Sequence, residues 1–450
     1  MNAQISNPQT ESLCPDCLQR IPAGYLRRDQ DVYLAKTCPV HGTFETVIWR
    51  GPPDFDAWVR PKTPGAPVFA GQPMDHGCPF DCGLCPEHRQ RTCTTVVEIT
   101  TRCNLDCAFC YADSSGAGSD ATVPEVDRLL AAVGRGAGQC NIQLSGGEPS
   151  LHPDLAAIVE RVRRHGFTFV QLNTNGLLLG RQPDLARTLK DAGLDSVFLQ
   201  FDGTDDAAYR RLRGRPLLAV KLAAVNACAA AGIGVVLVPT LVPGVNTHQV
   251  GAILDLAVDL APAVRGVHFQ PVSYFGRWTR PPADGDRLTL PELMRAIEAQ
   301  TGGRFCATAF HPPGCEHARC SFSGQFLVLA PGRIIALSRR TTSSCCPPAS
   351  AEAGARQAIA YTARQWAPAP QGQEAEPFAP AGGPICLETF CHRARTHTLS
   401  VSAMAFQDAW TLDLERLRGC CIHVAHPDGR LIPFCAYNLT GRDGRRLYRP

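Results

Sequence analysis

The sequence predicts an α/β fold, namely an open, partial (βα)6 barrel with cysteine-rich, metal-binding extensions on its N-terminal and C-terminal sides. Two observations predict this architecture. Between residues 95 and 302, short apolar runs alternate with segments of helical periodicity. On either side, cysteines occur in tight groups, and the chain of 450 residues contains 22 of them. We therefore expect three regions, 1–94, 95–302 and 303–450.

The central region predicts parallel strands separated by helices. The expected strands are rich in Val, Ile, Phe or Leu, as is typical of parallel strands buried on both faces. Strands are expected at 95–100, 141–144, 168–173, 196–201, 234–240 and 266–271. Helices are expected at 126–134, 153–164, 184–192, 217–231 and 247–260. In barrels of this kind, functional groups lie at the C-terminal ends of the strands.

Composition argues against several classes of partner. The formal net charge is only +3 and the basic residues are spread along the chain, which gives no electrostatic case for a nucleic-acid partner. The first residues lack the basic start and apolar core of a signal peptide. No apolar run approaches the ~18–20 residues of a membrane span. We therefore expect a cytoplasmic protein, whose grouped cysteines are metal ligands rather than disulfides.

The most informative motif follows the first expected strand. Cys103, Cys107 and Cys110 have the spacing Cx3Cx2C, and the aromatic Tyr111 comes next. Three thiolates can hold three irons of a cubane 4Fe–4S cluster, whose full complement is four. The fourth iron then stays open to another ligand, which distinguishes a catalytic metal from a structural one. The alternative is three core cysteines at this spacing by chance.

A second motif follows the second expected strand. It consists of Gly146, Gly147, Glu148 and Pro149. Glycines allow the backbone to approach a ligand closely, and the neighbouring carboxylate can accept hydrogen bonds from a cationic amino group. Asn175 and Asp202, at the ends of the third and fourth expected strands, are weaker candidates for cofactor contacts. Both precede glycine, and Asn-Gly and Asp-Gly are also ordinary turns.

The N-terminal region predicts two metal sites. Cys14 and Cys17 form a CxxC pair, and Cys38 and His41 form a CxxH pair, which together suit one tetrahedral ion, either zinc or a rubredoxin-like iron. A second group consists of Cys78, Cys82, Cys85 and Cys93. These four cysteines predict a fully ligated auxiliary 4Fe–4S cluster. The triplet Cys78, Cys82 and Cys85 has no expected strand before it and no aromatic residue after it. We therefore do not expect it to hold the catalytic cluster.

The C-terminal region predicts a further cluster. Its candidate ligands are Cys315, Cys320, Cys421 and Cys435. A hairpin is expected from 422–425 to 431–434 around a Pro-Asp-Gly turn, which would bring Cys421 near Cys435. The stretch 347–384, rich in Pro, Ala and Gly, is expected to be a loop with one short helix near 355–366.

The two central motifs resemble the signatures of the radical S-adenosylmethionine (SAM) superfamily. Cys103 to Tyr111 match its CxxxCxxC-aromatic motif, and residues 146–149 match its GGEP motif. The resemblance implies a barrel in which Cys103, Cys107 and Cys110 hold the catalytic cluster and the GGEP segment binds the amino group of SAM. It also implies reductive cleavage of SAM to a 5′-deoxyadenosyl radical, which abstracts hydrogen from an unactivated carbon.

Over nearly its whole length, the chain resembles a multi-cluster group that includes archaeal tetraether lipid synthase and radical SAM methyltransferases of a pterin precursor. This resemblance implies carbon–carbon bond formation on a lipid-like substrate, with peripheral membrane contact. Methyl transfer to a pterin-like heterocycle is the first alternative, and a non-catalytic iron–sulfur carrier is the second. A wide apolar tunnel would favour the lipid, and a compact polar pocket would favour the heterocycle. The expected electron donor is flavodoxin or ferredoxin.

Overall fold

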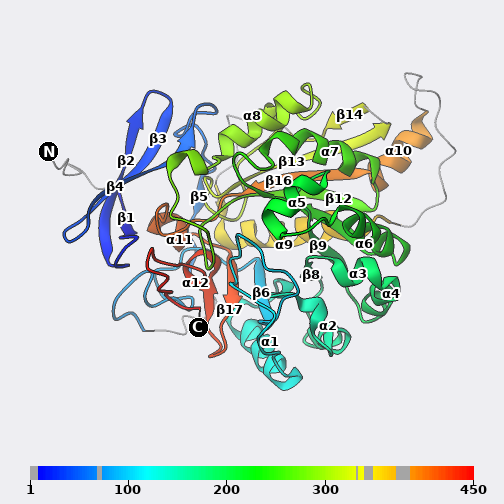
Figure 1. The fold of residues 1–450 in the computed structure, drawn as a ribbon, viewed down its shortest axis with the longest axis horizontal. Coiled ribbons are helices and arrows are strands. Elements are labelled where there is room, and N and C mark those ends of the chain that lie inside the picture. The colour runs from blue at the N-terminus through cyan, green and yellow to red at the C-terminus, as the bar shows by residue number, and fades with distance from the viewer. Residues whose placement is uncertain (1–8, 68–72, 331–332, 339–347, 371–385, 450) are drawn as a thin grey trace.

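A sheet of mostly parallel strands forms the centre of the molecule (Figure 1). This computed structural model describes residues 9–67, 73–330, 333–338, 348–370 and 386–449. The six expected strands are present as β6 (Thr94–Thr100), β7 (Asn141–Gly146), β8 (Val170–Thr174), β9 (Ser196–Gln200), β10 (Gly234–Val238) and β12 (Val264–Pro271). Each pairs in parallel with the next. The predicted α/β fold class is confirmed.

The C-terminal region adds strands to both edges of this core. Strand β17 (Ile422–Ala425) lies parallel beside β6, and β16 (Thr398–Met404) lies parallel beside β12. Beyond β16 come the antiparallel strands β13 (Ser321–Ala330) and β14 (Arg333–Ala336). Strand β18 (Leu431–Pro433) pairs antiparallel with β17, which confirms the predicted hairpin, and the short β11 (Thr240–Leu241) pairs with β12.

Helices cover one face of the sheet. The five expected helices are α1 (Val123–Ala137), α2 (Leu155–Arg164), α4 (Pro183–Asp191), α6 (Leu218–Ala230) and α7 (Val250–Asp259), the last preceded by the 3-10 turn η2 (Thr247–Gln249). Further elements are α3 (Leu177–Arg181), α5 (Asp206–Arg213), α8 (Leu290–Gln300), η1 (Pro149–Leu151), η3 (Asp284–Asp286) and η4 (Ala307–Ala309). Helix α1 begins at a capping box between Thr122 and Glu125.

The two faces of the sheet differ in polarity. On the helix-covered face, alternate strand residues such as Ile142, Leu172 and Leu237 belong to one large apolar core. The positions between them carry polar side chains on several strands, including Gln143 on β7 and Gln171 on β8. Because successive side chains of a strand point to opposite faces, the sheet is aliphatic outside and polar inside on β7 and β8. On β9 and β10, the inner face instead carries the apolar cluster of Phe198, Val236 and Val238.

Helix α9 (Ala351–Trp366) covers part of the polar face. Its contacts are with β10, β12 and β16, and it runs across the middle of the molecule in Figure 1. Only a shorter helix is expected from the sequence of this stretch, and residues 371–384 of the same stretch lie outside the described residues. The remaining helices are α10 (Leu387–Thr396), α11 (Leu414–Arg418) and α12 (Phe434–Tyr437).

The N-terminal region begins with a separate antiparallel sheet, drawn in blue at the left of Figure 1. Its strands are β1 (Thr10–Leu13), β2 (Arg20–Arg28), β3 (Asp31–Cys38) and β4 (Gly42–Arg50). Buried Lys36 ties it to the C-terminal region by donating to the Ala409 carbonyl at 2.7 Å. Strands β5 (Lys62–Thr63) and β15 (Ala349–Ser350) form a small parallel pair. Among the described residues, no helix has the length and apolarity that crossing a membrane requires.

Candidate active site and metal centres

The loop that carries Cys103, Cys107 and Cys110 begins where β6 ends, at the C-terminal edge of the parallel sheet. Backbone bonds hold this loop in place. The Cys103 amide donates to the Ser115 carbonyl at 2.7 Å, and Cys110 exchanges two backbone bonds with Arg277. The Arg277 Nε also donates to the Cys107 carbonyl at 3.0 Å. All three thiols are partly exposed, so the loop presents them at the mouth of the barrel.

The two glycines after β7 are required by close backbone packing. A Cβ on Gly146 would lie 2.1 Å from the Thr100 carbonyl oxygen, and one on Gly147 would lie 2.2 Å from the Arg102 carbonyl oxygen. Each carbonyl also accepts a backbone bond, from Gly147 at 2.8 Å and from Glu148 at 2.7 Å. The sequence suggested close approach to a ligand. The backbone that these glycines approach is the chain entering the cysteine loop, so they fix the two motifs against each other.

Glu148 is almost fully buried beside Pro149, the first residue of η1. Its Oε1 accepts from Thr174 and from both the amide and the hydroxyl of Ser150, and its Oε2 accepts from the Asn175 amide at 2.6 Å. These donors fix the position of the buried carboxylate. Oε2 has only one of these donors, which leaves it capacity for a cationic amino group.

Asn175 and Asp202 make protein contacts at the same edge. Besides its bond to Glu148, Asn175 donates through Nδ2 to the Asn104 side chain in the cysteine loop at 2.7 Å. Asp202 is fully buried and receives both arms of Arg213, at 2.6 and 2.9 Å. Its Oδ1 also accepts from the Thr240 amide at 3.2 Å. Asp202 thus anchors Arg213, whereas the sequence suggested contact with a cofactor.

Two buried cations of this edge were missed from the sequence. Burial alone would lower the pKa of the Arg213 guanidinium, but the charges of Asp202 and Cys107 raise it well above its ordinary value. Lys221, fully buried on α6, donates to the Asn175 carbonyl and to the Gln200 side chain. Burial lowers the pKa of Lys221 to about 7. Lys221 could have been noticed in the sequence as the single lysine of the apolar helix 218–230. Arg213 lies among several arginines, so the sequence does not single it out.

The surroundings of Cys103 disfavour a free thiolate. Burial raises the pKa of the Cys103 thiol to about 11. Neighbouring charge on Glu148, Cys107 and Cys110 acts in the same direction. A bound metal reverses this effect, because it stabilises thiolates directly. The donor set therefore fits an iron–sulfur cluster held by three cysteines, with Glu148 and the strand ends around its open side.

The structure brings Cys14, Cys17, Cys38 and His41 together as one group of four ligands. The Cys17 and Cys38 sulfurs lie 3.9 Å apart, and the His41 Nδ1 lies 3.6 Å from the Cys14 sulfur and 3.5 Å from the Cys38 sulfur. A tetrahedron with metal–sulfur bonds of about 2.3 Å has edges of about 3.8 Å. The four atoms are thus spaced for a single tetrahedral ion.

Cys93 lies with different partners from those expected from the sequence. It forms a buried group with Cys315 and Cys421, and the Cys93 and Cys421 sulfurs are 3.2 Å apart. The cause is the parallel pairing of β6 with β17, which sets Thr94 opposite Ile422. Cys435 is not a member of this group, and its sulfur accepts from the Gln407 amide at 3.3 Å.

Cys78, Cys82 and Cys85 line one cavity together. Tyr448 fixes the turn that carries them, since its hydroxyl accepts from the Cys82 amide at 2.9 Å and donates toward the Pro79 and Phe80 carbonyls. Within the described residues, Cys93 is not among those that line this cavity. The triplet therefore presents three thiols to one space, and its fourth ligand must come from elsewhere.

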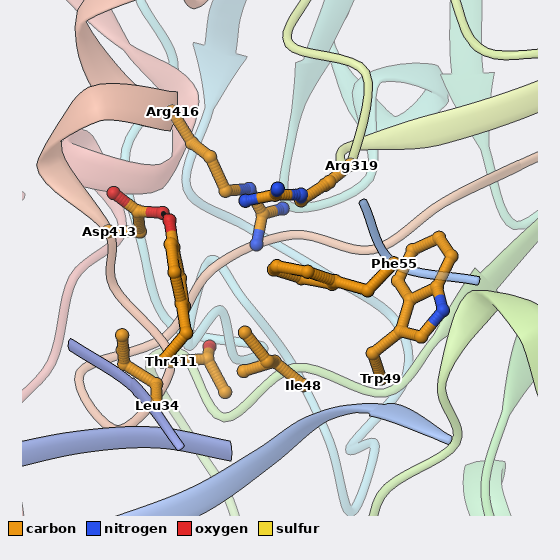
Figure 2. Close-up of a pocket in the computed structure, with 9 residues that line it drawn as sticks. Leu34, Ile48, Trp49, Phe55, Arg319, Thr411, Asp413 and Arg416 are labelled. Carbon is orange, nitrogen blue, oxygen red and sulfur yellow. Dashed lines mark hydrogen bonds between the residues drawn. The ribbon is translucent and has the colours of Figure 1, made fainter. Parts of the chain in front are cut away.

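Cys320 contacts an arginine pair shown in Figure 2. Arg416 lies beside Arg319, and its Nη2 is 3.5 Å from the Cys320 sulfur. The Arg319 guanidinium stacks on Phe55 of the N-terminal region, 3.5 Å from the ring centroid. Asp413 supplies the nearby negative charge and bonds Thr10 of β1 at 2.7 Å. This cluster joins the N-terminal sheet to the segment carrying Cys320.

The chain matches a known family over the segment that carries this site, and a known relative over nearly its whole length. Residues 97–257, which span the cysteine loop and the GGEP segment, match the family described as the radical SAM superfamily. The chain is also 32% identical to 7,8-dihydro-6-hydroxymethylpterin dimethyltransferase of Methanocaldococcus jannaschii, over 96% of this chain and 94% of that one. This chain belongs to the radical SAM superfamily. It is therefore an enzyme, and the alternative of a non-catalytic carrier is set aside.

Other similarities cover parts of this radical SAM protein. Residues 7–50 match the family described as the HMPTM N-terminal zinc ribbon domain. GTP 3′,8-cyclase of Paenarthrobacter nicotinovorans is 30% identical over 44% of this chain and 57% of its own length. Among solved structures, Streptococcus suis SuiB is similar with a TM-score of 0.38 and 14% identity, over 48% of this chain and 47% of that one.

Membership of the radical SAM superfamily implies a 4Fe–4S cluster and SAM as cofactors. Cys103, Cys107 and Cys110 would bind the 4Fe–4S cluster, and Glu148 would bind the amino group of SAM. The cluster with SAM supplies an adenosyl radical that abstracts hydrogen from carbon. The remaining cysteine groups fit auxiliary clusters, and the four N-terminal ligands fit zinc.

Proposed function

We propose that this radical SAM enzyme transfers methyl groups from a second SAM molecule or another methyl donor to a pterin-like heterocycle. One observation carries the proposal, namely the polar inner face of the barrel sheet below the cysteine loop. A flat heterocycle with hydrogen-bonding edges needs donors and acceptors fixed at several points of its pocket. A long hydrocarbon chain needs none of these groups, and burying them unpaired against it is costly.

A chain of hydrogen bonds leads from the cysteine loop onto this inner face. The Tyr111 hydroxyl bonds the Ser145 hydroxyl on β7 at 2.8 Å, and Asn173 on β8 donates to Ser145 at 3.2 Å. Further along the same face, Gln143 donates to Gln171 at 2.8 Å. The Oδ1 of Asn173 is buried and has no partner. This oxygen is an acceptor that suits an N–H group of the substrate.

Helix α9 packs an aromatic side chain against the same inner face. Trp366 packs on Phe198 of β9 with ring centroids 5.4 Å apart, and His268 of β12 lies 6.0 Å from the same indole. The Trp366 Nε1 is buried without a partner. His268 in turn bonds Ser402 at 2.8 Å. An aromatic wall with one free N–H suits a ring system that carries a carbonyl or an imine nitrogen.

Sequence similarity supports the same substrate class. The relative from Methanocaldococcus jannaschii is named for methylating 7,8-dihydro-6-hydroxymethylpterin, and it aligns with nearly the whole of this chain. Carbon–carbon coupling on a lipid-like substrate, with peripheral membrane contact, is the competing prediction. We place the enzyme in the cytoplasm with flavodoxin or ferredoxin as electron donor, because its grouped thiols require a reducing compartment.

An anaerobic assay tests this proposal. The chain is reconstituted with iron and sulfide, reduced, and supplied with SAM and either 7,8-dihydro-6-hydroxymethylpterin or an archaeal lipid extract. Mass spectrometry should find the pterin carrying added methyl groups. A coupled lipid product with an unmodified pterin would overturn the proposal in favour of the lipid alternative.

A pair of variants connects the assay to the inner face. Asn173→Leu keeps the side-chain shape but removes the free acceptor, so we expect kcat/KM for the pterin to fall about 10- to 100-fold, the usual effect of an unpaired polar group. Trp366→Phe keeps an aromatic ring but loses the N–H and should have a smaller effect in the same direction. SAM binding should be unchanged in both. If both variants methylate the pterin at the original rate, the pocket is not on this face.

A further inference from the structure

The cavity around Cys78, Cys82 and Cys85 contains a candidate for the fourth ligand of their cluster. A cubane cluster takes four protein ligands when it is fully coordinated, and Cys93 lies instead with Cys315 and Cys421. Two other side chains that line the cavity carry atoms able to bind iron, Glu87 and His88. The Glu87 carboxylate is engaged by the Cys78 amide at 3.2 Å and faces Arg418 at 3.6 Å.

His88 lines this cavity and has the free ring nitrogen that a ligand needs. It is only 5% exposed, and its Nε2 is buried without any hydrogen-bond partner. In the tautomer that carries its proton on Nδ1, the Nε2 lone pair is free to bind a metal. The turn closes where the His88 amide donates to the Cys85 carbonyl at 2.9 Å.

We propose that His88, through Nε2, completes the auxiliary cluster that Cys78, Cys82 and Cys85 hold. The cluster then has three thiolates and one neutral imidazole. Exchange of a thiolate for an imidazole makes the cluster less negative and raises its reduction potential, as histidine ligation does in other iron–sulfur proteins. The result is an electron-accepting centre of higher potential than a cluster with four cysteines.

A neighbouring histidine offers a matched control. His423 on β17 packs against His88 with ring centroids 4.9 Å apart, and its Nε2 is likewise buried and unpartnered. Its Nδ1 bonds the Thr92 hydroxyl at 3.1 Å. However, His423 is not among the residues that line the cysteine cavity. A purely structural role in packing predicts similar effects for both histidines, whereas ligation predicts an effect for His88 alone.

Pulsed electron paramagnetic resonance tests the assignment directly. The full chain carrying Cys103→Ala, Cys107→Ala and Cys110→Ala, which lacks the catalytic cluster, is reconstituted anaerobically and reduced. We expect a strongly coupled nitrogen on a reduced cluster. His88→Cys should keep the iron content but lose this coupling and shift the reduction potential to a more negative value. His423→Gln should change neither.

Three results would overturn the proposal. One is the absence of directly coupled nitrogen in the chain with His88 intact. Another is coupling that survives in His88→Cys, which would assign the nitrogen to another group. His88→Ala adds a measurement of iron alone, because loss of a ligand should lower the iron content whereas loss of a packing residue should not. Unchanged iron in His88→Ala, with the coupling still present, would equally exclude ligation.

Discussion

Replacement of Glu148 by glutamine tests the SAM site most sharply, because it changes one oxygen in a fully described network. The carboxylate accepts from Ser150, Thr174 and Asn175. A glutamine can keep its single oxygen toward Ser150 and Thr174, which donate to Oε1. Its NH2 group then faces the Asn175 amide, whose N–H donates to Oε2 of the glutamate at 2.6 Å. The side chain also loses its negative charge.

The size of the effect follows from this arrangement. A hydrogen bond to a charged group contributes about 1.5–3 kcal/mol, so losing the one between Oε2 and the SAM amino group should weaken SAM binding about 10- to 150-fold. The donors around Oε1 remain paired, so the fold should survive. Cluster content should also remain at its original value, because no cysteine has moved.

Equilibrium binding of radiolabelled SAM to the anaerobically reconstituted protein measures this loss. Glu125→Gln is the matched control, since Glu125 is an exposed carboxylate of the α1 capping box. That variant should bind SAM as the original protein does. If Glu148→Gln also binds SAM with unchanged affinity while its cluster is intact, the assignment of Glu148 to the amino group is refuted.

Further predictions concern metal, packing and pH. Cys38→Ser should abolish binding of one zinc ion per chain and expose the N-terminal sheet to limited proteolysis; zinc retained at full occupancy would contradict the assigned ligands. Gly147→Ala should displace the cysteine loop and lower iron incorporation, because its Cβ would meet the Arg102 carbonyl at 2.2 Å. A Cβ on Gly116 has nothing within 4 Å, so Gly116→Ala should keep the original iron content. Equal iron content in both variants would contradict this prediction. Burial lowers the pKa of His268 to about 4 from 6.5. As pH falls, the unfolded chain therefore protonates His268 before the folded chain does. Up to about 3 kcal/mol of stability is lost between pH 6.5 and 4. His268→Gln should flatten that part of the urea-midpoint profile, and an unaltered profile would show that His268 is not the group responsible.

The sequence was sufficient for the barrel core because local patterns encode it. The six inner strands are short apolar runs, and helical periodicity separates each from the next, so local patterns locate them. The hairpin at Pro427 to Arg430 was equally readable, because its turn residues fit only a tight reversal. What the apolar runs did not reveal is the polar inner face, which depends on residues such as Gln143 and Asn173 between them.

Long-range pairings could not be read from local patterns. Cys93 was grouped with Cys85 by proximity in sequence, whereas the parallel pairing of β6 with β17 places it against Cys421. Helix α9 lies in a Pro- and Ala-rich stretch whose sequence gives no sign that it covers the barrel. Arg213 likewise becomes a site residue only once Asp202 and Cys107 are folded around it.

Product analysis after reduction measures the central claim most directly. The anaerobically loaded protein is reduced with SAM present, and 5′-deoxyadenosine is quantified beside the variant in which Cys103, Cys107 and Cys110 are all alanine. The original protein should form 5′-deoxyadenosine, and the variant should form none although its auxiliary iron remains. Formation of 5′-deoxyadenosine by the variant at the original rate would contradict the assignment of the radical chemistry to these three cysteines.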